Sequence, residues 1–329
     1  MIQSKTKLIL TEQELTQMCT RAGIGDAKQF FPADNGDFNT VFRIATAAHG
    51  DFIMKISPRY GAPVLTHERR IMHTELTAYD LLRTRTNVRV PRVIFSDFSG
   101  KCMPCDWFIM EALSGCPLSR MPRAMRQSPD ILRAVGEAAA QIHSIRGEGF
   151  GYEQWGLRGG WRDAYLEMTH NIIADAKRLG AEIPDVREVR ETIRRFEREL
   201  DAVETPRLVH FGLCGDHILI TQENGAPLLG ALIDPDSAYW GDPAGDLILF
   251  GQPGETAFWE GYNAAGEPLE RNRSLSIRTL LMRLYLELIR YARADIRLEP
   301  SSFPYKRAKL AARRGIRQTL HALHTQEKR

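Results

Sequence analysis

The sequence changes character near residue 128, and this change is the strongest constraint on its fold. Upstream, short apolar stretches bounded by Gly, Pro and Asp predict strands. Downstream, apolar residues recur at helical spacing over long segments. With 329 residues, 43% of them hydrophobic, the chain is long enough for two domains, each with its own core. The pattern predicts an α+β protein with a strand-rich first part and a mainly helical second part.

The predicted elements follow one another with short connections. Strands are predicted at 41–45, 51–56, 93–95, 107–110, 218–220 and 228–233. Helices are predicted at 11–23, 65–84, 130–145, 161–179, 185–203, 244–263, 274–297 and 304–324. A turn at His49, Gly50 and Asp51 joins the first two strands into a hairpin, and Asn224-Gly225 joins the last two.

Charge is unevenly distributed along the chain. Residues 271–329 hold 15 Lys or Arg against 4 Asp or Glu, whereas the preceding residues hold 29 against 37. A basic end could bind nucleic acid or an anionic surface. Amphipathic helices also commonly carry a solvated basic face, and we favour this second interpretation, with no nucleic-acid partner.

The sequence favours a cytoplasmic protein. It has no run of about 18 apolar residues that could span a bilayer, and its first residues lack the apolar core of a secretion signal. The five cysteines are scattered and odd in number, which fits a reducing compartment. Cys102 and Cys105 form a C-x-x-C pair, which we interpret as a turn and not a zinc site. The oligomeric state stays open.

Two segments in the second part carry the main functional signal. They read LVHFGLCGDHIL at 208–219 and ALIDPD at 231–236. Asp234 directly follows an apolar strand, and a carboxylate fixed at a strand end suits Mg2+, which prefers one or two carboxylates together with phosphate oxygens. Asp236, two residues later, could add a further metal contact.

These segments resemble the aminoglycoside phosphotransferase and choline kinase group of small-molecule kinases, whose motifs read roughly HGDLHPGN and then IDFE. The segment from Gly149 to Asp163 also resembles the hygromycin phosphotransferase branch. The resemblance implies a two-lobed protein-kinase-like fold. It places a nucleotide-binding lobe at residues 1–112 and a helical lobe with the catalytic loop and acceptor cleft at 113–329.

The resemblance also implies a nucleotide site. Lys55 lies at the position that contacts the phosphates, and Glu75 lies at the position that pairs with it, with Glu68 as the alternative partner. The loop at 33–40 could approach phosphate oxygens through its backbone. The residues implied to bind the nucleotide, ATP or GTP, are Gly36, Asn39, Lys55, Glu75, Met110, Glu111 and Ala112.

The catalytic loop departs from the family pattern at the two positions that the family uses for catalysis and metal binding. Gly212 stands where the family has its catalytic Asp, and His217 stands where the family has a metal-binding Asn. His217 could still bind a metal with Asp234 and Asp236, with a shift in preference from Mg2+ toward Mn2+ or Zn2+. Asp216 is a candidate substitute for the missing base beside His210.

The segment WGDPAGDL at 240–247 resembles a further motif of the family, GDPxxDL. There the resemblance implies that Asp242 and Asp246 cap the next helix and brace the catalytic loop.

Two functions remain open from the sequence. The first is an ATP-dependent O-phosphotransferase that acts on a small hydroxylated acceptor, such as an aminoglycoside-like antibiotic or another metabolite. The second is a silenced kinase-fold protein that binds nucleotide or ligand without transferring phosphate. The residues retained at 55, 75 and 234 favour the first, and Gly212 favours the second.

Overall fold

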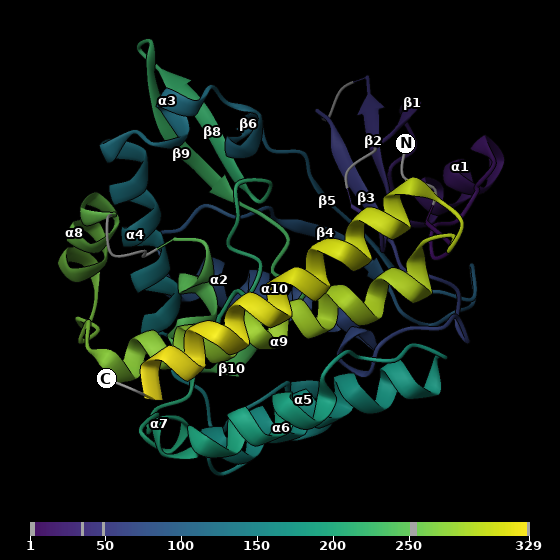
Figure 1. Cartoon of the computed structure of the whole chain (residues 1–329). Helices are drawn as coiled ribbons and strands as arrows, with labels where there is room; N and C mark the ends of the chain where they lie inside the picture. The colour runs from purple at the N-terminus through teal and green to yellow at the C-terminus, as the bar shows by residue number, and fades with distance from the viewer. Residues whose placement is uncertain (1–3, 34–35, 48–49, 251–254, 328–329) are drawn as a thin grey trace. The chain divides into compact units, whose positions relative to one another are not determined.

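The structure is a computed structural model that describes residues 4–33, 36–47, 50–250 and 255–327. It has mixed α and β structure, as predicted (Figure 1). The chain forms two compact units. The smaller comprises residues 1–64, 91–113 and 294–306, and the larger comprises 65–90, 114–293 and 307–329. The predicted division at residue 112 stays a prediction.

A five-stranded antiparallel sheet forms the centre of the smaller unit. Its strand order is β1-β2-β3-β5-β4. The strands are β1 (Ala27–Pro32), β2 (Thr40–Thr46), β3 (Phe52–Ile56), β4 (Val93–Asp97) and β5 (Trp107–Glu111). Four of the five were predicted, and the hairpin of β2 and β3 is confirmed. The strand β1, which pairs along β2 and has no buried residue, was not predicted from the sequence.

One helix and one face of this sheet enclose the core of the smaller unit. The helix α1 (Glu12–Arg21) begins with a capping box in which Thr11 and Glu14 bond each other's backbone amides. The buried residues of this core are Leu15, Met18, Cys19, Ile24, Phe42, Ile44, Met54, Ile56, Met103, Cys105, Trp107 and Ile109. Cys102 and Cys105 lie in the connection between β4 and β5, where a turn was predicted.

The larger unit is mainly helical. Its principal helices are α2 (Ile71–Arg85), α4 (Pro129–Ser144), α5 (Trp161–Arg178), α6 (Val186–Arg195), α7 (Glu197–Asp201), α8 (Thr256–Ala265), α9 (Arg273–Arg297) and α10 (Phe303–Glu327), of which α9 and α10 also contribute to the smaller unit. Its strands are β6 (Cys116–Pro117), β7 (Arg207–Val209), β8 (Ile218–Glu223), β9 (Ala226–Leu232) and β10 (Tyr239–Gly241). The predicted turn between β8 and β9 is confirmed, with positive φ at Asn224 and Gly225.

Glycines allow α4 and α8 to pack closely side by side (Figure 1). A Cβ atom at Gly136 of α4 would lie 2.0 Å from the Phe258 carbonyl oxygen. A Cβ atom at Gly261 of α8 would lie 2.0 Å from the Arg133 carbonyl oxygen. A larger residue at either position would force the two helices apart.

Three predicted helices differ from the structure. The helix predicted at 65–84 begins only at Ile71, because Arg70 adopts a left-handed conformation with φ of 57°. The segment 185–203 forms two helices that are interrupted at Phe196. The prediction for 244–263 was wrong over its first part, where residues 243–248 form a 3-10 helix. Residues 34, 35, 48, 49 and 251–254, which several predictions include, lie outside the described residues.

The described helices include none that is both long and apolar enough to cross a membrane.

Candidate active site

The loop that follows β7 is braced by one buried carboxylate. Asp246, from the 3-10 helix η4 (Pro243–Ile248), accepts hydrogen bonds from the backbone amides of His210 and Phe211, each at 2.8 Å. The side chain of Asp242 accepts a hydrogen bond from the Ala244 amide at 3.0 Å and caps η4. Both roles predicted for this tail motif are therefore confirmed.

The backbone conformations at 211 and 212 do not match the residue types found there. Phe211 has φ of 55°, a left-handed conformation that favours glycine. Gly212, by contrast, lies outside the left-handed region and could accept a side chain without backbone strain. The loop therefore has the backbone that a His-Gly-Asp sequence would suit, although it reads His-Phe-Gly. Phe211 is held by stacking on Tyr285 and by an edge contact with Tyr239.

Three carboxylates gather in the larger unit next to this loop. Oxygens of Glu75 on α2 and of Asp234 and Asp236 after β9 lie within 4.8 Å of one another. The amide of Asp234 donates a hydrogen bond to the Tyr79 hydroxyl at 2.9 Å, which ties the Asp234 backbone to the same face of α2. Asp234 has φ of 65°, which turns the chain sharply after the strand. The donor set of hard oxygens suits a divalent cation such as Mg2+ or Mn2+.

His217 lies between the loop and this cluster. Its Nδ1 lies 2.7 Å from the Gly212 carbonyl oxygen, and its Nε2 lies 3.3 Å from an Asp234 oxygen. Burial lowers the pKa of His217, but Asp234, Cys214 and Asp236 outweigh burial and raise it to about 10. In its protonated form, His217 has an acceptor at each ring nitrogen, and its positive charge offsets part of the negative charge of the carboxylate cluster. A neutral ring that kept its proton on Nδ1 would leave Nε2 available to a metal.

His210 stays neutral for the opposite reason. It is 1% exposed, and its Nδ1 accepts a hydrogen bond from the Gly212 amide at 3.1 Å. Burial lowers its pKa to about 4, which Asp246 only partly counteracts. Protonation of His210 would prevent Nδ1 from accepting the hydrogen bond of the Gly212 amide, and it would place a positive charge in the loop.

This burial predicts a loss of stability in acid. Because the unfolded chain binds a proton near pH 6.5 and the folded chain only near pH 4, the free energy of unfolding should fall across that interval by at most about 3 kcal/mol from His210. His210→Asn keeps an acceptor near Nδ1 and should flatten this dependence. Denaturant unfolding at pH 4, 5, 6 and 7 measures it.

The control for this prediction is His170→Asn, which changes an exposed histidine of α5. It should retain the wild-type pH dependence. If His210→Asn and the wild type lost unfolding free energy equally between pH 6.5 and 4, the burial argument for His210 would be wrong.

In the smaller unit, the loop before β2 is anchored from two directions. The hydroxyls of Ser4 and Thr6 donate to the carbonyl oxygens of Asp37 and Phe38. Arg297, at the end of α9 and 2% exposed, pairs with the Asp37 carboxylate and lies 4.7 Å from the Phe38 ring centroid. This loop contains Gly36, with φ of 86°, and Asn39.

The other nucleotide residues predicted from sequence also lie in the smaller unit. Lys55 on β3 is 5% exposed. The amides of Glu111 and Ala112, at the end of β5, donate to the carbonyl oxygens of Arg92 and Asp51 at 3.0 Å each. Adenine contacts from these two residues would therefore use their carbonyl oxygens. Met110 lies within the strand and is buried. The pairing of Lys55 with Glu75 stays a prediction.

Asp216 is exposed and accepts a hydrogen bond from the Ser119 hydroxyl. The amide of Ser119 donates to the Gly215 carbonyl oxygen at 2.9 Å, so this pair of contacts ties the loop to the segment after β6. The role of Asp216 as a substitute base stays a prediction.

Sequence reasoning missed the narrow aromatic pocket beside the loop. It is lined by Thr66, His67, Gly151, Tyr152, Trp155, Gly156, Glu167, Met168, Asn171, Ile172 and Tyr285. Tyr285 reaches the catalytic loop through its stacking on Phe211, with ring centroids 5.7 Å apart. Tyr152 and Trp155 lie too far from Tyr285 in sequence to predict that they share a pocket.

Known proteins of similar structure are small-molecule kinases. A Ralstonia eutropha protein assigned as an aminoglycoside phosphotransferase aligns with a TM-score of 0.65 at 15% identity, over 96% of this chain and 98% of its own. Macrolide 2'-phosphotransferase MphH from Brachybacterium faecium aligns with a TM-score of 0.61 at 19% identity, over 91% and 97%. The ternary complex of APH(4)-Ia with AMP-PNP and hygromycin B aligns with a TM-score of 0.60 at 16% identity, over 94% and 97%.

These likenesses confirm the predicted two-lobed, protein-kinase-like α+β fold. Among curated proteins, none matches the sequence. The family model described as the phosphotransferase enzyme family, APH, matches residues 32–273, which include the loop at 33–40, the loop at 208–219 and the carboxylate cluster. Because this match covers well over half of the chain, the protein belongs to the phosphotransferase enzyme family, as its motifs predicted.

Proposed function

We propose that this protein is an ATP-dependent O-phosphotransferase that transfers the γ-phosphate to a hydroxyl of a small molecule. The observation that carries the proposal is the cluster of Glu75, Asp234 and Asp236 beside the braced catalytic loop. Such a cluster would hold Mg2+ or Mn2+, with His217 as a further ligand in its neutral form. When bound, the cation neutralises charge on the phosphate oxygens.

The nucleotide is proposed to bind to the smaller unit. Its support is the anchored loop at Gly36 and Asn39 and the buried Lys55 on β3. In the described part of the chain, Oδ1 of the buried Asn39 has no hydrogen-bond partner, and a bound ligand would satisfy it. ATP is the proposed donor, with GTP as the alternative that a competition experiment would distinguish.

The acceptor is proposed to be a polyhydroxylated molecule without a high positive charge. Among the described residues lining the aromatic pocket, Glu167 is the carboxylate, and it already pairs with Arg158. A polycationic acceptor would require more free carboxylates there. Trp155, which is 36% exposed, and Asn171 instead offer a ring face and a neutral polar group, which suit a sugar-like ligand.

The function can be tested by restoring a carboxylate at position 212, where the family has its catalytic base. A Cβ atom at Gly212 would lie 3.1 Å from His217 Nδ1 and 3.2 Å from His210 Nδ1, so an Asp there crowds both rings. Gly212→Asp should therefore act fully only with His217→Asn, because the pair restores the family's residues at positions 212 and 217 and opens space. We expect the double variant to turn over ATP about a hundredfold faster than His217→Asn alone, the lower end of what a positioned base contributes.

The measurement is ATP consumption over an acceptor panel with Mg2+ or Mn2+, together with isothermal titration of ATP. Gly25→Asp, at an exposed position between α1 and β1 with open space for a side chain, is the control for an added carboxylate and should leave the rate unchanged. ATP binding without turnover in the wild type and in the double variant would reject the transferase. It would instead favour the silenced, nucleotide-binding alternative that Gly212 supports.

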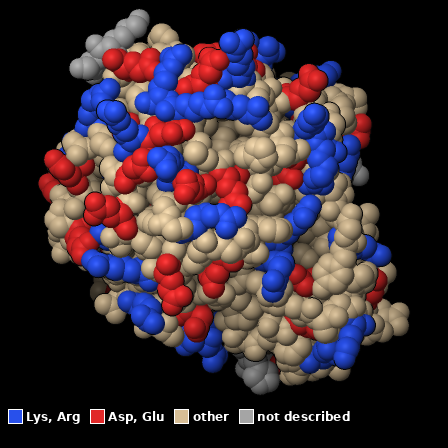
Figure 2. All heavy atoms as spheres, turned by 90° about the horizontal axis from the view of Figure 1, so that it is seen from below, with Lys and Arg blue, Asp and Glu red and all other residues tan. Residues whose placement is uncertain are grey.

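A nucleic-acid function has less support. Several arginines of the basic segment pair with carboxylates, including Arg278 with Asp242 and Arg317 with Asp185. On the face in Figure 2, Lys and Arg side chains are interspersed with Asp and Glu. We therefore retain the interpretation of a solvated basic face.

A further inference from the structure

A second cavity lies on a different face of α2 from the carboxylate cluster. Its volume is about 330 Å³, at the lower end of the range for small-ligand sites. It is lined by Arg70, His73, Thr74, Thr77, Ala78, Leu81, Glu153, Gln154, Leu208, Ala238, Tyr239 and Trp240, all of the larger unit. None of these residues belongs to the proposed nucleotide, metal or catalytic set.

The helical repeat separates the two faces of α2. Thr74, Thr77 and Leu81 recur at spacings of three and four residues and line the cavity. Glu75 and Tyr79 lie about a third of a turn away, and Glu75 faces Asp234 and Asp236. The cavity and the proposed metal site therefore share one helix and use different faces of it.

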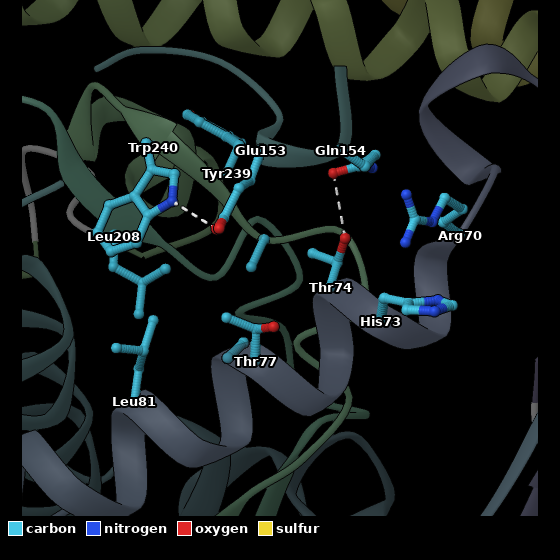
Figure 3. Close-up of a pocket in the computed structure, with 12 residues that line it drawn as sticks. Arg70, His73, Thr74, Thr77, Leu81, Glu153, Gln154, Leu208, Tyr239 and Trp240 are labelled. Carbon is cyan, nitrogen blue, oxygen red and sulfur yellow. Dashed lines mark hydrogen bonds between the residues drawn. The ribbon is translucent and has the colours of Figure 1, made fainter. Parts of the chain in front are cut away.

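The wall formed by Trp240 is rigid. Its indole Nε1 donates a hydrogen bond to a Glu153 oxygen at 3.2 Å (Figure 3). Its backbone pairs with Gly151 in both directions, and a Cβ atom at Gly147 would lie 2.5 Å from the indole ring. The ring thus rests directly on a glycine and is fixed on several sides. On the opposite wall, Thr74 donates a hydrogen bond to Gln154 at 3.2 Å.

The two ends of the cavity differ in chemistry, as Figure 3 shows. Arg70 and His73 lie together at one end, whereas Trp240, Leu208 and Leu81 lie at the other. The hydroxyl of Thr77 and the amide of Gln154 lie between them. The carboxylate of Glu153 keeps its charge and is bonded to the indole at the Trp240 end, whereas the guanidinium of Arg70 is the charged group at the opposite end.

We infer that this cavity binds a small amphipathic carboxylate. The ligand's anionic group lies at Arg70, and its apolar body lies against Leu81, Leu208 and the Trp240 ring. An arginine pairs with a carboxylate through two parallel hydrogen bonds, which fixes the ligand's direction. The site is independent of the proposed transfer reaction, because its residues and its ligand differ from those of the active site.

Three probes with one apolar body and different charges test the inference. They are 4-phenylbutyrate, the neutral 4-phenylbutyramide and the cationic 4-phenylbutylamine, and their dissociation constants are measured by ligand-observed NMR. Because Arg70 is exposed, its pairing should make the carboxylate bind about fivefold tighter than the amide. The amine should bind more weakly than either.

Two variants test whether the probes bind in this cavity. Arg70→Asn removes the charge and tolerates the left-handed backbone at this position, so the preference for the carboxylate should vanish while the amide still binds. Thr77→Phe fills the cavity from an exposed helical position, so all three probes should lose binding. Arg83→Gln, which changes an exposed arginine of α2 outside the cavity, should bind as the wild type does.

Absence of binding by 4-phenylbutyrate at millimolar concentration would overturn the inference. Equal binding of the three probes, or binding that survives Thr77→Phe, would also overturn it. None of these readouts depends on ATP turnover, so the result stands apart from the test of the phosphotransferase itself.

Discussion

Asp234→Asn is expected to lower ATP turnover about a thousandfold while leaving the fold intact. The Asp234 carboxylate belongs to the cluster with Glu75 and Asp236 and faces His217 Nε2 at 3.3 Å. A metal centre contributes several kcal/mol to the stabilisation of charge in a transferring phosphoryl group. About 4 kcal/mol corresponds to three powers of ten in rate. Asn removes the charge and keeps the shape.

The backbone makes this substitution a clean one. Asp234 has φ of 65°, and Asn is one of the few residues that adopts this conformation readily. The hydrogen bond to Tyr79 uses the amide at 234 and is retained. The melting temperature should therefore change little, and loss of turnover would report on chemistry.

The matched control for this prediction is Asp80→Asn on the exposed side of α2. It removes one carboxylate from the same unit and should leave turnover at the wild-type level. The comparison is repeated in the Gly212→Asp/His217→Asn background, where turnover is expected to be higher. If Asp234→Asn retained half of the turnover in either background, Asp234 would have no essential role.

The strands and the functional loop could be predicted because their signals are local. The alternation around Lys55 predicted β3 and its hairpin with β2, and the Asn-Gly pair predicted the β8–β9 turn. Likewise, Asp234 directly follows its strand, and Asp242 caps the segment that follows it. In each case the residues that determine the structure lie within a few positions of one another.

The features that were missed depend on contacts between distant segments. Glu75 lies on α2, more than 150 residues before Asp234, so sequence spacing cannot reveal that their oxygens lie within 4.8 Å. The three-residue strands β7 and β10 exist because they pair with each other. The left-handed conformation of Phe211 could not be predicted either, because its ring contacts with Tyr239 and Tyr285 hold it.

The catalytic loop is held by contacts that do not involve the side chains at 211 and 212. The Asp246 carboxylate accepts hydrogen bonds from the amides of His210 and Phe211, and the His217 ring contacts the Gly212 carbonyl oxygen. These contacts use backbone groups, which do not depend on the side chains at 211 and 212. The backbone of the loop is therefore held without a carboxylate at position 212.

Because Asp246 accepts hydrogen bonds from the loop, we expect Asp246→Ala to have the largest effect on stability of the substitutions considered. The carboxylate is 2% exposed and accepts hydrogen bonds from the amides of His210 and Phe211 and a contact from His143 Nε2 at 3.1 Å. His143 is itself held by the Tyr262 hydroxyl at 2.8 Å from Nδ1. Alanine would leave three donors without an acceptor, two of them buried and the Phe211 amide partly buried. We expect a loss of about 4 kcal/mol in the free energy of unfolding.

Thermal unfolding measures this loss as a fall in melting temperature of about 10 °C. Asp246→Asn retains one acceptor oxygen and should show about half of the fall. Asp201→Ala removes an exposed carboxylate that pairs with Arg162, and should shift the melting temperature by no more than about 2 °C. If Asp246→Ala behaved like Asp201→Ala, the loop would have to be held by its aromatic contacts, and Phe211→Gly should then destabilise the protein more than any change at 246.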